Sequence, residues 1–437
     1  MKQALTRVVR QHIPRGGVQA IEEAYRRGRV RAVSAYYGNP ASSLRVIGVT
    51  GTNGKTTTVN YINEILKEAG YRTAMFSTAT IEVGGKAERN ELNATVASTG
   101  EMQRFFRRAK REKVDFAVLE FPSHALHQHK LDTVPVEVAV MTNLTQDHLD
   151  YHGTMEAYAD VKARLFRKQP KFIILNRDDE WFDFFNQFPA EAQKITYGKH
   201  ESADAHIDRV KLFRKGTEAG LTIDHQTKLE LATSLPGEFN AYNMIAAASV
   251  AYLLGINLET IAEGIANLEA VPGRFDRIET EKGFDVIVDY AHTPDALEKL
   301  LQTARSITKR RVILVFGACG DRDKSKRPIM GGIAARLADR IFLTDEESYN
   351  EDPQQIRTQI YEGIEAAKGQ VRTTEVADRR EAIAKALELA KKGDTVLVTG
   401  MGHEMYRIVN GERLPWNDEQ VIRELLEQPS STTDRSA

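Results

Sequence analysis

Short apolar runs alternate with longer segments of helical periodicity along most of the chain. Runs such as RVIGV, FAVLEF, VEVAV, FIILN, VIVDY, RVILVF, RIFL and TVLVT are each followed by glycine or polar residues and then by a helix-like segment. This pattern is typical of parallel strands that are buried on both faces of a sheet. It predicts an α/β protein with a mostly parallel sheet.

The strand-like runs fall into two series. The first occupies roughly residues 44–268, and the second begins near Phe284. Pro272 and Gly273 lie between them, where they favour a change of chain direction. A chain of 437 residues is also too long for one ordinary core. We therefore expect a short helical N-terminal segment (1–44), a central domain (45–270) and a C-terminal domain (271–437).

Composition restricts the partners and the compartment. Lys and Arg number 60 and Asp and Glu 61, and the two signs are interspersed, so neither nucleic acid nor an anionic membrane is expected as a partner. The single cysteine, Cys319, cannot form an internal disulfide, which favours a reducing compartment. The sequence shows neither a signal-peptide pattern nor an apolar run long enough to span a membrane. We expect a cytoplasmic protein.

The stretch GVTGTNGKTTT, residues 48–58, predicts a phosphate-binding loop between a strand and a helix. Glycines permit a tight turn, after which backbone N–H groups and the positive helix end point at one anion. Lys55 would reach the outer phosphates, and Thr56 would coordinate magnesium. Val49 departs from the strict pattern, and the alternative is a plain glycine turn. The expected nucleotide contacts of the loop are Gly51, Thr52, Asn53, Gly54, Lys55, Thr56 and Thr57.

GVTGTNGKTTT also resembles the nucleotide loop of the Mur ligases, the ATP-dependent amino-acid-adding enzymes of peptidoglycan precursor synthesis. Further matches follow in the family's order: NLTQDHLDYHGTMEAYADVKARLF, GEFNAYNMIAAASVA, VPGRFDRIE, VDYAHTPDALEKLL, VFGACGDRDKSKRP and GMGHE. The last three are most similar to the MurE branch, the tripeptide synthetases. The resemblance implies a P-loop ATPase fold for the central domain, a Rossmann-like C-terminal domain, and ATP and Mg²⁺ as cofactors.

The resemblance also implies that the acceptor carboxylate is activated as an acyl phosphate before an amine captures it. Glu120 corresponds to the family's magnesium-associated carboxylate, His148 to its second-metal ligand, and Lys162 to a lysine carried as a carbamate. An imidazole on magnesium is chemically unusual, because hard cations prefer oxygen. The alternatives are a surface carboxylate, a loop-packing histidine and an ordinary helix-face lysine.

Further nucleotide contacts are implied on both sides of the predicted hinge. Arg274 resembles the arginine that approaches the γ-phosphate. Arg274 and the residues named in the next sentence are each also suited to a cap or turn position. The other implied contacts are Asn176, Asp179, Asn240, Asn243, Asp289 and His292.

The amino-acid side departs from the family. Arg322 and Glu404 match residues that hold the incoming amino acid, but the D-N-P-R segment of diaminopimelate-adding members reads EESY here. Tyr349 therefore replaces an arginine, and Glu347 adds negative charge. An acidic pocket favours a distal amine over a distal carboxylate. Our hypothesis is that the amino acid is cationic, lysine or ornithine, or else neutral.

The acceptor side departs as well. Some 45 residues precede the loop, too few for the family's UDP-binding domain. We therefore expect an acceptor without the usual UDP group, or a partner protein that helps to bind it. Arg26, Arg27, Arg29 and Arg31 suit either a phosphate or a solvated helix face. The implied acceptor contacts are Thr95, Ser123, His124 and Lys130.

Three functional hypotheses remain. The leading one is a ligase that adds an amino acid to the carboxylate of a muropeptide-like acceptor. The second is a Mur-like ligase with another acceptor, of the folylpolyglutamate or poly-amino-acid type. The third is an inactive nucleotide-binding scaffold. The joint presence of the residues expected for catalysis argues against it; these are Lys55, Glu120, His148, Lys162 and Arg322.

Overall fold

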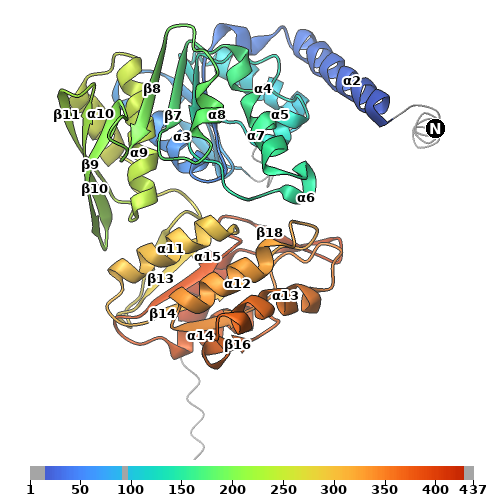
Figure 1. Ribbon diagram of the computed structural model, residues 1–437, viewed down its shortest axis with the longest axis vertical. Coiled ribbons are helices and arrows are strands. Elements are labelled where there is room, and N and C mark those ends of the chain that lie inside the picture. The colour runs from blue at the N-terminus through green and yellow to red at the C-terminus, as the bar shows by residue number, and fades with distance from the viewer. Residues whose placement is uncertain (1–14, 91–96, 428–437) are drawn as a thin grey trace, which may run out of the picture.

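The computed structural model describes residues 15–90 and 97–427 of the chain. An N-terminal helix, α2 (Arg15–Tyr36), and a 3₁₀ turn, η1 (Pro40–Ser43), precede two sheets that form two layered bodies (Figure 1). α2 extends away from the first body, and its later turns contact α4 (Thr99–Arg111). The expected helical N-terminal segment is therefore present.

The first sheet has eleven strands in the order β11-β10-β9-β8-β7-β6-β1-β5-β2-β3-β4. Pairing is parallel from β2 through β9, and an antiparallel segment lies at each edge. Its strands are β1 (Arg45–Thr50), β2 (Thr73–Phe76), β3 (Thr80–Val83), β4 (Lys86–Arg89), β5 (Phe116–Glu120), β6 (Val138–Met141), β7 (Phe172–Asn176), β8 (Gln193–Gly198), β9 (Ala205–Phe213), β10 (Gly216–Ile223) and β11 (Thr227–Thr233).

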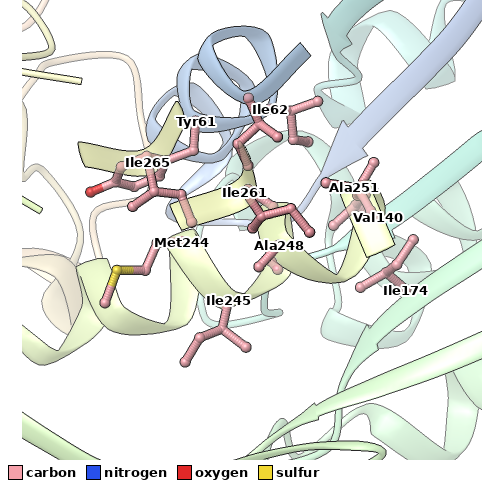
Figure 2. Packing of buried hydrophobic residues seen from close by; sticks show 14 of the residues in the cluster. Tyr61, Ile62, Val140, Ile174, Met244, Ile245, Ala248, Ala251, Ile261 and Ile265 are labelled. Carbon is pink, nitrogen blue, oxygen red and sulfur yellow. The ribbon is translucent and has the colours of Figure 1, made fainter. Parts of the chain in front are cut away.

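Helices cover both faces of this sheet, because each face carries its own buried apolar cluster. One cluster joins the sheet to α3, α9 and α10, and Figure 2 shows Tyr61, Met244 and Ile261 of these helices packed together. The remaining helices lie against the other face or near the strand ends. The helices are α3 (Lys55–Glu68), α4, α5 (Ser123–His127), α6 (Leu149–His152), α7 (Met155–Ala163), η2 (Phe166–Lys168), α8 (Phe182–Asn186), α9 (Glu238–Leu253) and α10 (Leu258–Ala266).

The second sheet has six strands in the order β12-β13-β17-β14-β15-β16, and all neighbours except β12 and β13 pair in parallel. Two apolar clusters again lie on opposite faces. The elements are β12 (Asp276–Glu279), β13 (Asp285–Asp289), α11 (Pro294–Ile307), β14 (Val312–Phe316), α12 (Lys326–Leu337), β15 (Arg340–Leu343), α13 (Pro353–Ala366), η3 (Gln370–Arg372), β16 (Thr373–Glu375), α14 (Arg379–Leu389), β17 (Thr395–Thr399), the hairpin β18 (Tyr406–Val409) and β19 (Glu412–Pro415), and α15 (Asp418–Glu427).

The predicted α/β class and mostly parallel sheet are confirmed. Every apolar run named above forms a strand, because a strand buried on both faces has to be apolar throughout. The antiparallel strands β9 to β11 were not expected. Their exposed positions alternate with buried ones, so they lack a continuous apolar run. The predicted domain boundaries stay a prediction, and the chain passes from the first sheet to the second between Ala266 and Asp276.

The two bodies touch through polar side chains. The Asn53 amide donates to Asp295 Oδ2 at 2.8 Å, and the Gln146 amide donates to Asp323 Oδ2 at 3.0 Å. Arg274 donates to Thr56 Oγ1 at 3.3 Å. Residues from both sheets are therefore close enough to act on one ligand.

Candidate active site

The phosphate-binding loop lies where β1 ends and α3 begins. Gly54 has a φ of 86° and caps α3, and a Cβ atom there would collide with the Asn243 amide oxygen. A Cβ on Gly51 would collide with the Thr142 hydroxyl. Both positions therefore need glycine for close packing. The free N–H groups of the first α3 turn are left to face a ligand.

A cavity of about 1190 Å³ opens between the two bodies, in front of this loop. Both bodies line it, which brings together most of the site residues predicted from sequence. The predicted residues in its wall are Thr52, Asn53, Gly54, Lys55, Thr56, Thr57, Glu120, His124, Lys130, His148, Asn176, Asp179, Asn240, Asn243, Arg274, Asp289, His292 and Arg322.

The other predicted site residues lie behind or beside this wall. Gly51, Ser123 and Lys162 are buried in the first body, and Glu347, Tyr349 and Glu404 belong to the second. Thr95 lies outside the described residues.

Glu120, at the end of β5, is buried beside the loop. One of its oxygens accepts hydrogen bonds from Thr56 Oγ1 at 2.9 Å and from the Thr78 N–H at 2.7 Å. A carboxylate and a hydroxyl are the hard oxygen donors that Mg²⁺ prefers. Among the described residues, no group of three or more His, Cys, Asp or Glu side chains is placed to hold a metal ion. Magnesium would thus share Thr56 and Glu120 with nucleotide phosphates, the usual arrangement for this ion.

Two lysines point at the carbonyls of the loop. Lys55 Nζ donates to Gly51 O at 3.0 Å and to Thr52 O at 2.8 Å, and Lys162 Nζ reaches Gly51 O at 2.7 Å from the rear. Burial lowers the pKa of Lys55, and burial together with the nearby Lys55 charge holds the pKa of Lys162 well below its usual range. A buried lysine of low pKa spends more time as a neutral, nucleophilic amine.

Asp147, which our sequence analysis did not single out, lies in the cavity wall at one of the places where charged groups of the two bodies meet. Its oxygens lie 3.4 Å from Lys326 Nζ, 3.2 Å from His148 Nε2 and 3.7 Å from His292 Nε2. Burial alone would raise the pKa of Asp147, but the Lys326 ammonium, followed by the neighbouring imidazoles of His148 and His292, holds it well below its usual range. Asp147 also accepts the His148 N–H at 2.9 Å.

Through this hydrogen bond Asp147 holds its neighbour His148, whose backbone conformation is strained. His148 has a φ of 54°, in the left-handed region that non-glycine residues seldom adopt. Burial holds the pKa of the His148 imidazole well below its usual range, so the ring is neutral and able to act as a ligand. The motifs TQDHLDYHG and GDRDKSKRP contain Asp147 and Lys326, but nothing local in the sequence joins the two residues.

We expect Asp147→Asn to lower the free energy of unfolding by about 3 kcal/mol, because it leaves the Lys326 ammonium buried without a countercharge. The double variant Asp147→Asn/Lys326→Met should recover much of this loss, since it removes both buried charges. Urea titrations of both variants measure the difference. Equal destabilisation by the single and double variants would contradict the pairing.

The remaining nucleotide-side residues hold loops as well as line the cavity. Asn176 donates to Thr142 O at 2.9 Å, and Asp179 accepts the Leu144 N–H at 2.8 Å. Asn243 donates to Asn240 Oδ1 at 3.3 Å. Asp289 likewise accepts the N–H groups of Phe275 and Ala291 at 2.7 and 2.8 Å. The bond from the Ala291 N–H to Asp289, two residues earlier, is a turn contact of the kind that the sequence alternative expects, and the other bonds hold neighbouring segments together at the cavity wall.

On the amino-acid side, Arg322 lies against the Tyr349 ring, with the guanidinium carbon 5.0 Å from the ring centre. The Tyr349 hydroxyl donates to Glu347 at 3.0 Å. Tyr290, in the cavity wall, donates to Glu404 at 3.3 Å. Burial, reinforced by Glu347, raises the pKa of Glu404 to about 8. Glu346, aligned with the same departure from the family, is also buried nearby and accepts from Cys319.

On the acceptor side, Ser123 Oγ contacts His152 Nε2 at 3.0 Å, and the His124 and His148 rings lie 4.6 Å apart. Burial lowers the pKa of His124, and burial with Arg29 lowers that of Lys130. His152 was not predicted, although it follows His148 in the same motif.

A phosphate loop, a buried carboxylate at its helix and an arginine from the connection between the two bodies together define a nucleotide-dependent transferase or ligase site. Residues 49–251 match the Mur ligase middle domain, and residues 273–402 match the Mur ligase glutamate ligase domain. The chain belongs to the Mur ligase family. It is an ATP-dependent ligase that forms amide bonds in peptidoglycan precursor synthesis.

A curated relative from Geobacillus kaustophilus, UDP-N-acetylmuramoyl-L-alanyl-D-glutamate--2,6-diaminopimelate ligase, is 41% identical over 92% of this chain and 83% of its own length. A solved structure of a ligase with the same name is 33% identical, with a TM-score of 0.63, and the match covers 93% of this chain and 82% of that one. Folylpolyglutamate synthase from Mycobacterium tuberculosis, solved with ADP, shares the fold at 21% identity and a TM-score of 0.72, covering 85% and 91% of the two chains.

Across residues 15–90 and 97–427, none of the helices combines the length and the apolar character that crossing a bilayer requires.

Proposed function

We propose that this ligase adds an amino acid to the carboxylate of a muropeptide-like acceptor, with magnesium, in the cavity between the two bodies. The observation that carries the proposal is the pairing of Thr56 with both Glu120, at 2.9 Å, and Arg274, at 3.3 Å. This grouping of a hydroxyl, a carboxylate and a guanidinium beside the phosphate loop supports the proposal, because such groups neutralise the charge of a transferring phosphate.

In the proposed reaction, an oxygen of the acceptor carboxylate attacks the γ-phosphorus of ATP, and the bond to the β,γ-bridging oxygen breaks to release ADP. The amine of the amino acid then attacks the acyl carbon, phosphate leaves, and the amine loses a proton. Lys55 and Arg274 would neutralise the charge that develops on the phosphate oxygens. Bound magnesium would supply further charge neutralisation, held by Thr56 and Glu120, with His148 and a carbamylated Lys162 as the further predicted ligands.

For the amino acid, we propose a cationic or neutral side chain, with lysine and ornithine as the leading candidates. The relatives above are named as diaminopimelate ligases. In this chain the expected distal arginine is Tyr349, and the carboxyl groups of Glu346, Glu347 and Glu404 are all buried nearby. Buried carboxyl groups disfavour a distal carboxylate and offer acceptors to a distal amine.

The test measures phosphate release with ATP, acceptor and one amino acid at a time. Lysine, ornithine, alanine and diaminopimelate are compared, with UDP-linked and UDP-free muropeptides as acceptors. Highest kcat/KM with lysine, ornithine or alanine supports the proposal, and diaminopimelate as the sole good substrate would overturn it.

The raised pKa of Glu404 leads to a prediction about how the stability of the native state depends on pH. Its folded value of about 8 lies above the ordinary 4.5, so the native state holds an extra proton between these values. The stability of the native state therefore declines as the pH rises from about 4.5 to about 8. Glu404→Gln, which keeps the neutral form, should flatten this decline in denaturation curves recorded across that range. Glu412→Gln, at an exposed position, is the matched control and should leave the profile unchanged.

A further inference from the structure

The chain segment that carries Arg322 is held by the loop after β15. Arg322 lies in the cavity wall, in the connection between β14 and α12. The Gly320 N–H donates to Glu347 O at 2.7 Å, and a Cβ atom on Gly320 would collide with Ser348 O. Asp321 has a φ of 51°, in the left-handed region that non-glycine residues seldom adopt. Such a conformation persists only where surrounding groups fix it.

Glu351, in the same loop, supplies this support. Its Oε1 accepts the Asp321 N–H at 2.7 Å. The Arg327 guanidinium donates to both carboxylate oxygens, at 3.0 and 3.2 Å, and Lys324 Nζ lies 3.2 Å from Oε2. The hydrogen bonds from Arg327, followed by those from the Asp321 N–H and Lys324, lower the pKa of Glu351 to about 2 against the opposing effect of burial. Glu351 is therefore a carboxylate at neutral pH.

Arg327 ties this carboxylate to the helices of the second body. The Arg327 side chain is fully buried in the first turn of α12, and it also donates to Gln359 of α13 at 2.7 Å and to the Cys319 carbonyl at 3.0 Å. α12 and α13 pack against each other (Figure 1). Glu351 is thus anchored to two packed helices on one side and holds the Asp321 backbone on the other.

The contacts of the Arg322 side chain are weak by comparison. Its guanidinium donates to the Asp321 carbonyl at 3.3 Å and to the Tyr349 hydroxyl at 3.4 Å, both long for hydrogen bonds. Both acceptors are neutral, whereas a bound carboxylate would form shorter, charge-assisted bonds with the same guanidinium. The direction from which Arg322 enters the cavity is therefore set mainly by its backbone.

We propose that Glu351 is a positioning residue for the amino-acid substrate. It fixes the Asp321 backbone, and the fixed backbone directs Arg322 towards the α-carboxylate of the incoming amino acid. This inference rests on the proposed function, in which the cavity binds an amino acid. The amine has to meet the activated acyl group within a narrow range of positions, so a shift of the carboxylate anchor by about 1 Å misaligns it.

Two substitutions of Glu351 separate side-chain length from charge. Glu351→Gln keeps the length and an oxygen for the Asp321 N–H but loses the charge. Glu351→Asp keeps the charge opposite Arg327, but it is one methylene shorter and cannot reach both the guanidinium and the Asp321 N–H. Positioning therefore predicts that aspartate is the more harmful change. A purely structural role of the buried ion pair predicts the reverse order, because only aspartate leaves Arg327 with a countercharge.

Phosphate release with ATP and acceptor, titrated with lysine, ornithine, alanine or diaminopimelate, measures the KM for the amino acid. All four carry an α-carboxylate, so the effect applies to whichever is turned over. We expect Glu351→Asp to raise this KM at least about 10-fold and Glu351→Gln to raise it far less, with the KM for ATP unchanged in both. Arg380→Met/Glu424→Met, which removes an exposed ion pair of the second body, is the control and should keep both wild-type constants.

A further variant covers the case in which a single substitution fails to fold. Glu351→Met/Arg327→Met removes both members of the pair, leaves no buried charge unpaired, and offers no acceptor to the Asp321 N–H. It should show the same rise in the amino-acid KM as Glu351→Asp. Circular dichroism and thermal unfolding check that each variant is folded.

An amino-acid KM for Glu351→Gln equal to or above that for Glu351→Asp, or a parallel rise in the KM for ATP, would overturn the proposal. Arg322→Ala tells its failure apart from that of the proposed function. If Arg322→Ala leaves the amino-acid KM unchanged, the cavity does not bind the amino acid through Arg322, and both assignments are wrong. If Arg322→Ala raises that KM and the Glu351 variants do not, the proposed function stands and only the role of Glu351 is wrong.

Discussion

The variant Lys55→Ala should lose acceptor-dependent ADP formation by about 10³-fold in kcat. Lys55 is half-buried at the cavity, and its side-chain nitrogen donates to the carbonyls of Gly51 and Thr52. Bound phosphates would offer stronger, charged acceptors to the same group. Alanine removes this charge while leaving the glycine turn and the α3 helix intact.

Steady-state ADP release, with ATP, acceptor and amino acid all present, measures the loss. Lys67→Ala, in the last turn of the same helix and outside the cavity wall, is the control and should keep wild-type activity. The assay also separates a ligase from an inactive scaffold. A scaffold would bind ATP yet form no ADP with any acceptor, so a wild-type protein without turnover would contradict the ligase assignment.

Lys162→Arg is expected to reduce kcat by about 10²- to 10³-fold, if Lys162 acts as a carbamate. Carbamylation joins the neutral amine to carbon dioxide and releases one proton, which leaves an anionic carboxylate on the nitrogen. The structure favours the neutral amine, since burial and Lys55 hold the pKa of Lys162 well below its usual range. Arginine places a permanent cation near Gly51 and cannot form this carbamate, because its guanidinium remains protonated.

A measurement independent of turnover accompanies this variant. Protein equilibrated with ¹³C-bicarbonate should show one carbamate resonance that Lys162→Arg lacks, and removing carbon dioxide should lower wild-type activity. Lys171→Arg, at an exposed position, is the control and should keep both signals. Full activity without carbon dioxide, and no such resonance, would leave Lys162 as an ammonium that supports the Gly51 carbonyl.

Much of the fold could be predicted because the sequences of its central strands are continuous apolar runs. β1, β5 and β6 are buried at nearly every position, so each one carries a local signal. β9, β10 and β11 form one end of the sheet, and exposed polar residues in β9 and β11 interrupt the apolar pattern there. The N-terminal helix was expected and is present as α2.

The site could be predicted as far as each motif is contiguous. The loop with Lys55 and Thr56 is one continuous stretch of chain, and its glycines indicate the turn. Asp147 was missed, because its partner Lys326 is 179 residues further along and no local pattern joins the two. Glu346 was missed as a site residue for a related reason, since its proximity to Glu404 depends on the packing of two separate loops.

The sequence by itself determined the family, the two-sheet α/β architecture and the chemical types assembled for nucleotide binding, because these depend on local runs and contiguous motifs. The tertiary structure alone decided which charges meet. It placed Arg274 on Thr56, set Lys326 against Asp147, and buried Lys162 and Glu404 so that their pKa values move towards neutrality. Desolvation and ion pairing depend on distances between residues far apart in the chain, and these distances exist only once both bodies have folded and met.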